Sequence, residues 1–154
     1  MKRFSFISIL IALGLVYATI WLEGGNILSF LSPSCFVSTF GISFVIMLAL
    51  YNPTDMKRAF MAVAMKNQAS REDLLVALAF FSTMQRVMLA TGPFGLILGF
   101  IHVLEGLGHP DVYAIGEGVA VALISILYSF GGMIFIAIPR IGAAKKKLAL
   151  LQIG

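Results

Sequence analysis

The chain has 154 residues, of which 60% are hydrophobic and 12% charged, and its formal net charge is +4. A soluble domain carries roughly 25% charged residues, so this composition excludes an ordinary water-soluble protein and indicates an integral membrane protein. One cysteine, Cys35, excludes an internal disulfide, and with two histidines it is too little for a Cys or His metal site. We therefore expect a membrane protein without a metal or a cofactor.

Four apolar stretches are long enough to cross a hydrocarbon core of about 30 Å as helices, which takes ~20 residues. No Asp, Glu, Lys or Arg lies well inside any of them. The runs are continuously apolar, whereas barrel strands alternate, so an all-α protein is predicted. The predicted spans are residues 4–22, 34–51, 87–104 and 118–138.

The first stretch follows Met1, Lys2 and Arg3 and could be a signal peptide. It is long for a signal core, it lacks a small-x-small cleavage motif before a polar chain, and another span begins at residue 34. We expect residues 4–22 to remain as a permanent transmembrane helix.

The charges predict the orientation. With a cytoplasmic N-terminus, all 11 Lys and Arg residues fall on the inner side, including those of the tail, residues 139–154. Basic residues accumulate on the cytoplasmic side, so both termini are predicted to be cytoplasmic. The lysines of the tail are expected to lie against anionic lipid. The outer loops carry Glu23, Glu105, Asp111 and Glu117.

The inner segment, residues 52–86, is predicted to be helical. Pro53 ends the second span, and Thr54 or Asp55 is expected to cap a short amphipathic helix. Another helix start is predicted at Ser70, and its pattern continues without a breaker into the third span. This third helix would project from the membrane by about four turns of ~5.4 Å. Its apolar side chains would need cover by self-association or by a partner: Leu74, Leu75, Leu78, Phe80 and Phe81.

The spans lack the ionisable side chains on which proton relays and driven transporters depend. Small multidrug exporters need a buried carboxylate, so that class is excluded. The loops offer no catalytic Ser/His/Asp grouping and no phosphate-binding Gly loop followed by Lys, so an enzyme is not expected. His102 is expected to be interfacial, with proton handling as the alternative. The outer carboxylates are expected to be solvated, with an ion-attracting vestibule as the alternative.

Small residues on the third and fourth spans predict close helix packing, because glycine lets two backbones approach. Hydroxyl side chains on the same spans can bond to their own helix backbone, so structural use is the first expectation for each of them. The glycines that we expect to pack are Gly92, Gly95 and Gly99 of the third span and Gly131 and Gly132 of the fourth.

Two ordered stretches carry a family resemblance. The first is EGGNILSFLSPSCFVSTFGISFVIMLALYNPTDMKRAFMAV, a short apolar loop and a helix that ends in an Asp-x-x-basic stretch. The second, GLILGFIHVLEGLGHPDVYAIGEGVAVALISILYSFGGMIFIAIP, holds Gly-x-x-x-Gly, a Pro-Asp loop, Gly-x-Ala-x-Ala-Leu, Leu-Tyr and a closing Pro139. In this order the stretches resemble the MotA/TolQ/ExbB family, and within it the flagellar stator A-subunit most.

The resemblance implies an energising complex of a bacterial inner membrane. Five A-type subunits form a ring, a homopentamer, around the single transmembrane helices of two MotB/ExbD/TolR-like B-type subunits, and H⁺ or Na⁺ flow turns one against the other. In this family the ion-carrying Asp belongs to the B-type helix. The lack of Asp and Glu inside the spans of this chain is therefore what the resemblance to an A-type subunit implies.

Some positions depart from the family pattern. Leu96 and Ile126 stand where the stator family places hydroxyls, and the family's proline would fall near Met88, whereas this chain has Pro93. Displaced hydroxyls are therefore the candidates for an ion pathway: Thr91, Ser125 and Ser129.

The cytoplasmic segment is also much shorter than in flagellar A-subunits. Its charged residues are expected to form a solvated helix face, with torque transfer to a rotor as the alternative: Lys57, Arg58, Arg71, Glu72 and Asp73. Two other hypotheses stay open for the whole chain. One is a non-conducting scaffold of the same family, motivated by Leu96 and Ile126, and the other is a packing subunit of a larger membrane assembly.

Overall fold

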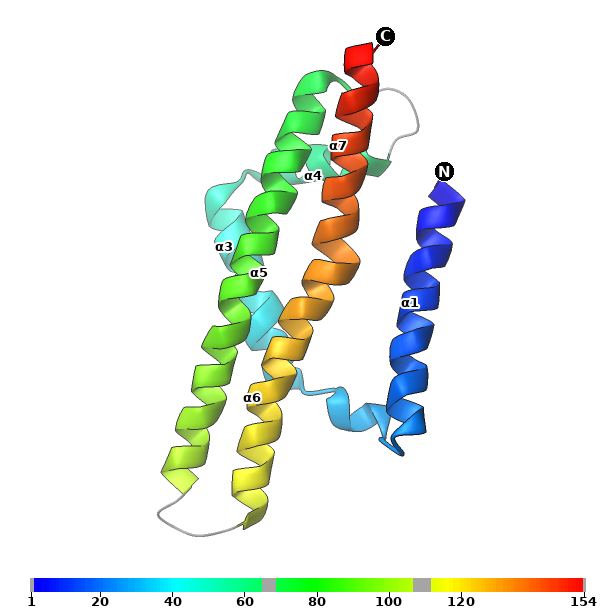
Figure 1. Cartoon of the computed structure of the whole chain (residues 1–154). Coiled ribbons are helices and arrows are strands. Elements are labelled where there is room, and N and C mark those ends of the chain that lie inside the picture. The colour runs from blue at the N-terminus through cyan, green and yellow to red at the C-terminus, as the bar shows by residue number, and fades with distance from the viewer. Residues whose placement is uncertain (1, 65–68, 107–111, 154) are drawn as a thin grey trace.

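The computed structural model describes residues 2–64, 69–106 and 112–153. These residues are helical with short connections and contain no strand, which confirms the all-α prediction for them (Figure 1). The elements are α1 (Lys2–Leu22), the 3-10 helix η1 (Ile27–Phe30), α2 (Pro33–Phe36), the π-helical η2 (Val37–Gly41), α3 (Ile42–Leu50), α4 (Pro53–Ala64), α5 (Arg71–Gly106), α6 (Val112–Gly132), the π-helical η3 (Met133–Ala137) and α7 (Ile138–Ile153).

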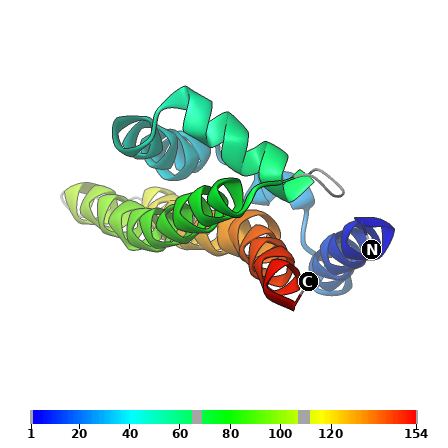
Figure 2. The same cartoon turned by 90° about the horizontal axis from the view of Figure 1, so that it is seen from above.

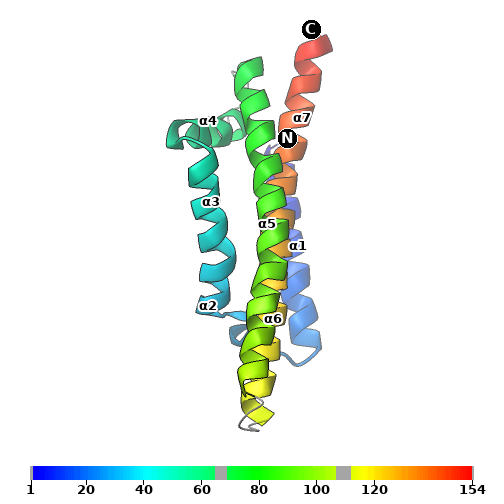
Figure 3. The same ribbon diagram turned by 90° about the vertical axis from the view of Figure 1, so that its left-hand side faces the viewer.

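Three helical segments are long and apolar enough to cross a membrane: Pro33–Leu50, Arg71–Glu105 and Ile115–Leu151. A further apolar helix, Ile7–Leu22, is shorter. The start of α5 and the end of α7 lie at the same end of the molecule, near α4 (Figures 1 and 3). The chain is therefore a multi-pass membrane protein whose basic segments gather at one end.

The long third helix is present as predicted. α5 is one helix of 36 residues, about 54 Å at ~1.5 Å per residue. Ser70 caps its start, because its Oγ accepts a hydrogen bond from the Asp73 backbone N at 3.1 Å and donates one to Asp73 Oδ2 at 2.9 Å. Pro93 lies inside the helix and supplies no backbone N–H there.

The fourth helix continues past Pro139, where the sequence analysis placed the end of the span and the start of a tail. α6 passes through η3 into α7, which reaches Ile153. Proline clashes with the carbonyl four residues before it in a regular α-helix. The wider π-helical turn directly before Pro139 relieves this clash and lets the helix continue.

The short helix α4 begins one residue earlier than the expected caps, Thr54 and Asp55. The Asn52 carbonyl accepts hydrogen bonds from the backbone N of Asp55 at 2.9 Å and of Met56 at 3.1 Å. Proline is favoured at the first helical position, so Pro53 starts α4. The expectation that Thr54 or Asp55 precedes the helix is thus wrong. α4 lies across the end of α3 and beside the first turns of α5 (Figure 3).

The projecting part of α5 is covered by its own chain. Leu74, Phe80 and Phe81 are at most 1% exposed, and they pack in one apolar cluster with Ala59 and Ala62 of α4. Ile141 and Leu148 of α7 pack against the same cluster. The expectation that this whole face needs a second chain is therefore wrong, because α4 and α7 supply the cover. Leu78 is half-buried, and Leu75 stays exposed.

α1 stands apart from the bundle of α5, α6 and α7 (Figures 1 and 2). Its main contact is with η1, the next element in the chain. Most of its large apolar side chains are exposed, such as Leu15 and Trp21. The tightly packed part of the molecule is therefore built by α2 to α7.

Candidate functional site

The seam between α5 and α6 is made of small residues. A Cβ on Gly92 would lie 2.6 Å from Ser129 Cβ, and one on Gly95 would lie 2.6 Å from Ser125 Cβ. Gly99 meets Ala122, whose Cα would be 2.8 Å from the added Cβ. No side chain fits on α5 at these positions, so the glycines permit the close helix approach that the sequence predicted.

Glycines of the fourth span extend this seam at both ends. A Cβ on Gly132 would lie 2.7 Å from Met88 Sδ, and one on Gly118 would lie 2.5 Å from Val103 Cγ2. Gly118 was missed by the sequence analysis, although its spacing of four residues to Ala122 places both on one helix face. Gly131 faces open space, so it contributes no packing within the chain.

The three candidate hydroxyls come together beside this seam and are buried. Thr91, Ser125 and Ser129 are 4%, 1% and 2% exposed. Ser129 Oγ donates to the Met88 carbonyl, and Thr91 Oγ1 lies 3.1 Å from the same oxygen. Ser125 Oγ donates to the Val121 carbonyl at 3.1 Å. Thr91 and Ser125 thus bond to the backbone of their own helix, as expected, whereas Ser129 bonds across the seam to α5.

Two hydroxyls of the second span complete a cluster that the sequence analysis did not assemble. Ser43 Oγ donates to the Thr39 carbonyl at 2.6 Å and lies 3.1 Å from Thr91 Oγ1. Thr39 Oγ1 is 3.5 Å from the Ser125 carbonyl oxygen. Their spacing of four residues on an apolar helix was the available signal. We call the following five residues the hydroxyl cluster: Thr39, Ser43, Thr91, Ser125 and Ser129.

The side chains of the hydroxyl cluster can donate and accept hydrogen bonds, but they have no ionisable group that could carry a proton. Ser and Thr hydroxyls donate and accept without ionising near neutral pH, and every buried side-chain N or O of the described residues has a partner. The described spans hold no Asp, Glu, Lys or Arg between residues 4 and 22, 34 and 51, or 87 and 104. These stretches therefore offer no carboxylate of their own that could carry a proton.

The two apolar replacements, Leu96 and Ile126, lie on the other flank of the seam. Thr91 faces α3, and Leu96 is about 140° further round α5 at ~100° per residue. Ile126 is likewise turned from the face where Ser125 meets Thr39, and both replacements are partly exposed. The flank that is turned away from α3 is therefore apolar at these positions.

The sequence that forms α3 to α7 matches a known protein family. A model of the MotA/TolQ/ExbB proton channel family matches residues 44–151, which include the seam and Thr91, Ser125 and Ser129. The chain belongs to this family. Comparison with curated proteins finds no match. Members of the MotA/TolQ/ExbB family are channel subunits of energy-transducing membrane complexes and not enzymes.

Two cations of α7 contact the short helix α4. The Arg140 guanidinium lies over the Phe60 ring at 5.3 Å and the Phe81 ring at 5.7 Å. Lys147 Nζ donates to the carbonyls of Ala62 at 2.6 Å and Val63 at 3.2 Å, the last turn of α4. One of the three consecutive lysines thus caps a helix end, where a cation is favourable.

The charged residues proposed for rotor contact divide into two groups. Lys57 and Arg58 on α4 and Arg71 and Glu72 on α5 are exposed, as a solvated face requires. Asp73 is half-buried and serves the Ser70 cap. The structure therefore gives Asp73 a local role and leaves the other four at the surface.

The loop that follows α1 is tied to α6 by two hydrogen bonds. Tyr128 Oη donates to the Phe30 carbonyl at 2.7 Å and accepts from the Ser32 backbone N at 3.1 Å. His102 Nδ1 lies 3.8 Å from Glu105 Oε2, with both side chains at least 73% exposed. The His102 side chain is thus exposed in the single chain, and its place at the membrane interface stays a prediction. Of the other outer carboxylates, Glu23 and Glu117 are exposed, and Asp111 lies outside the described residues.

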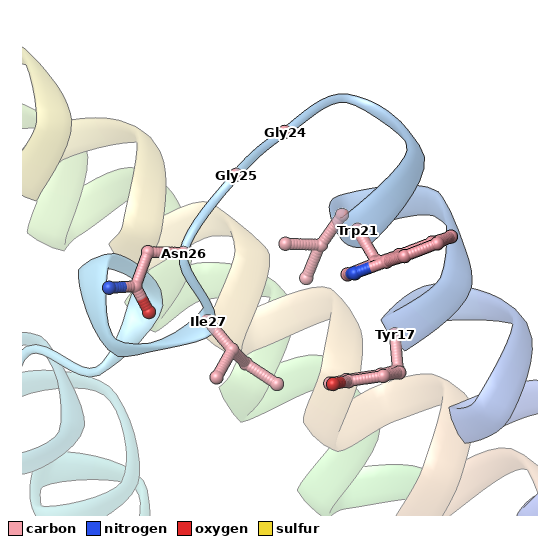
Figure 4. Close-up of a pocket in the computed structure, with 7 residues that line it drawn as sticks. Tyr17, Trp21, Gly24, Gly25, Asn26 and Ile27 are labelled. Atoms are coloured by element: carbon pink, nitrogen blue, oxygen red, sulfur yellow. The ribbon is translucent and has the colours of Figure 1, made fainter.

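A cavity of about 420 Å³ opens at the outer end of α1 (Figure 4). Tyr17 and Trp21 line it from α1, and Gly24 to Ile27 line it from the loop. Gly24 has φ of 70°, a conformation that favours glycine, and this turns the chain sharply there. The cavity holds no charged side chain, and its Tyr and Trp are typical of a membrane boundary.

Proposed function

We propose that this chain is the A-type, MotA-like subunit of an ion-motive-force-driven complex. Five copies would surround two B-type helices whose Asp carries H⁺ or Na⁺, and ion flow would drive rotation. The chain would cross a bacterial inner membrane four times, with both termini in the cytoplasm. α1 would be the first span.

One observation carries this proposal. The chain combines a glycine-packed pair of membrane helices with spans that lack any Asp, Glu, Lys or Arg at depth. An ionisable group inside a membrane is expensive and marks the ion path of a transporter. A member of a proton channel family that lacks such a group must receive it from another chain.

The proposed ion pathway passes Thr91, Ser125 and Ser129. All three are buried in the single chain, Thr91 against Ser43 and Ser125 beside Thr39 of the second span. A partner carboxylate would therefore reach them only if the contact of the second span with α5 and α6 opens in the assembly. This opening is part of the proposal.

The test is to purify the chain from membranes with and without co-expressed single-span subunits that bear an Asp, and to count the chains by mass. Five copies with two partner helices would support the proposal. A stable monomer or dimer under both conditions would sink it.

A non-conducting scaffold is the second candidate, and a specific observation favours it. The flank of the α5–α6 seam that turns away from α3 carries Leu96 and Ile126, and the hydroxyls face inward. Such a scaffold would assemble with its partner and pass no protons in vesicles. Proton flux that Thr91→Val and Ser129→Ala abolish would favour the conducting role instead.

A further inference from the structure

A second, strongly apolar cavity of about 420 Å³ lies between the second span and α5. Phe36, Phe40 and Met47 line one wall, and Phe80, Met84 and Met88 line the other. Met56 and Phe60 of α4 close its cytoplasmic end. We call this cavity the lipid groove, for the occupant argued below.

The walls of the lipid groove carry almost no polar side chain that could bind a polar ligand. Ser43 is its single hydroxyl among the described lining residues, and that hydroxyl already donates to the Thr39 carbonyl. The remaining lining is aromatic, aliphatic or methionine apart from Gly41. Methionine side chains adapt to occupants of irregular shape. The groove therefore suits a flexible hydrocarbon.

The length of the groove fits one leaflet of a membrane. Phe36 and Met47 are eleven residues apart, which is ~16 Å along a helix at ~1.5 Å per residue. Half of a hydrocarbon core is ~15 Å thick. Phe36 and Phe44 at the rim are more than half exposed, so the groove is open to its surroundings.

A cation, Arg140, lies next to the groove without lining it. Arg140 touches two lining residues, because its guanidinium stacks over Phe60 and its Nη1 donates to the Ile136 carbonyl at 2.9 Å. No carboxylate of the described residues pairs with it. A guanidinium has five N–H donors and binds phosphate well. Lys57, next to Met56, is exposed on the same helix as Phe60.

We propose that the lipid groove binds an acyl chain of an anionic phospholipid from the cytoplasmic leaflet, with Arg140 at its phosphate. An apolar slot of one leaflet's length with a cation beside it is complementary to such a lipid. The inference goes beyond the proposed function. It depends on α4 lying at the cytoplasmic surface and not on any partner subunit.

The test is photo-crosslinking of the full chain in vesicles of phosphatidylglycerol and phosphatidylcholine. In one variant, p-benzoylphenylalanine replaces Phe44 at the rim of the groove. In the control variant it replaces Phe94 of α5, which is exposed and lies outside the groove. Adducts of the control give the ratio of the two lipids in the surrounding bilayer. Adducts at position 44 should be enriched in phosphatidylglycerol about fivefold over position 94, the effect of one cation beside anionic lipid. Equal ratios at both positions would overturn the proposal. Adducts to α1 or to a second copy of the chain would overturn it too.

Matched variants separate the tail from the headgroup. A Cβ on Gly41 meets only Val37 Cγ1 at 3.6 Å, so Gly41→Leu fills the groove without a backbone clash. It should lower lipid adducts about tenfold, which is ~1.4 kcal/mol, whereas Gly14→Leu on α1 should not. Arg140→Gln should remove the enrichment and Arg140→Lys should keep it. Undiminished adducts in Gly41→Leu, or enrichment that survives Arg140→Gln, would contradict the assignment. If Gly41→Leu lowers the helical signal in circular dichroism, this variant is misfolded. The comparison of Arg140→Gln with Arg140→Lys then tests the proposal.

Discussion

The two ends of the α5 helix are packed by different means. Between Met88 and Val103, the helix meets α6 through Gly92, Gly95 and Gly99, and no large side chain lies between the backbones. Near its N-terminal end, α5 meets α4 and α7 through a cluster of aromatic rings. The ring centroids of Phe80 and Phe81 in this cluster are 5.1 Å apart. The same helix thus uses close backbone contact in one half and an aromatic core in the other.

The difference follows from the surroundings. Lipid tails are as apolar as leucine, so burying apolar side chains drives membrane helices together only weakly, and close packing does most of the work. At the other end, which we propose to lie in the cytoplasm, water is near and burial of rings contributes about 25 cal/mol per Å². We therefore expect the two halves to respond differently to the same kind of substitution.

The largest expected effect is in the aromatic core. Phe81 is fully buried and contacts Phe60, Phe80 and Arg140. Phe81→Ala should lower the free energy of unfolding by about 3 to 5 kcal/mol, because it leaves a cavity. Unfolding in detergent followed by circular dichroism measures this. The control is Phe94→Ala at an exposed site of the same helix, and equal losses for both variants would show that this core is not formed.

A smaller loss is expected at the glycine seam. Gly99→Ala places a methyl group 2.8 Å from the Ala122 Cα, so the helices must separate. The expected cost is about 1 to 3 kcal/mol, as for overpacking elsewhere. Gly131→Ala adds the same methyl group where nothing lies within 4 Å and should be neutral or slightly stabilising. Similar behaviour of the two variants in the same unfolding assay would argue against a close α5–α6 contact.

The hydroxyl cluster should contribute less again. Thr91→Val removes the contacts of Thr91 Oγ1 with Ser43 Oγ and the Met88 carbonyl. Ser43 keeps the Thr39 carbonyl, and the Met88 carbonyl keeps Ser129, so no partner is orphaned. Hydrogen bonds between membrane helices average about 0.6 kcal/mol, and we expect a loss of that size. A loss above about 2 kcal/mol would mean that the cluster is more important for stability than these contacts indicate.

The smallest effect is expected at the end of α4. Lys147→Met keeps the aliphatic stem but removes the cation from the carbonyls of Ala62 and Val63. The expected cost is about 0.3 to 1 kcal/mol, with faster hydrogen exchange confined to the last turn of α4. Lys146→Met, at an exposed neighbour, should leave that exchange unchanged. Exchange that stays slow in Lys147→Met would show that the cap has no effect there.

Local patterns of the sequence predicted much of this fold. The absence of a breaker after Ser70 predicted one long helix, and Gly92, Gly95, Gly99 and Gly132 predicted close packing. These features depend on one helix or on one facing pair, so residue spacing is enough to find them.

What the sequence did not show depends on contacts between distant segments. The cover of Phe80 and Phe81 comes from α4 and α7, and Lys147 reaches α4 across 85 residues of sequence. Only the fold reveals such a return of the chain. The contact of Thr91 with Ser43 could not be predicted either, because the sequence allows both hydroxyls to face the central channel of an assembly as well as each other.

The measurement that tests the central claim most directly is proton flux in sealed vesicles under an imposed potential. The claim is that this wall has no ion carrier of its own. The chain alone should pass no more protons than empty vesicles, flux should begin when an Asp-bearing single-span partner is added, and Asp→Asn in that partner should stop it. Sustained proton flux through the chain alone would contradict the account.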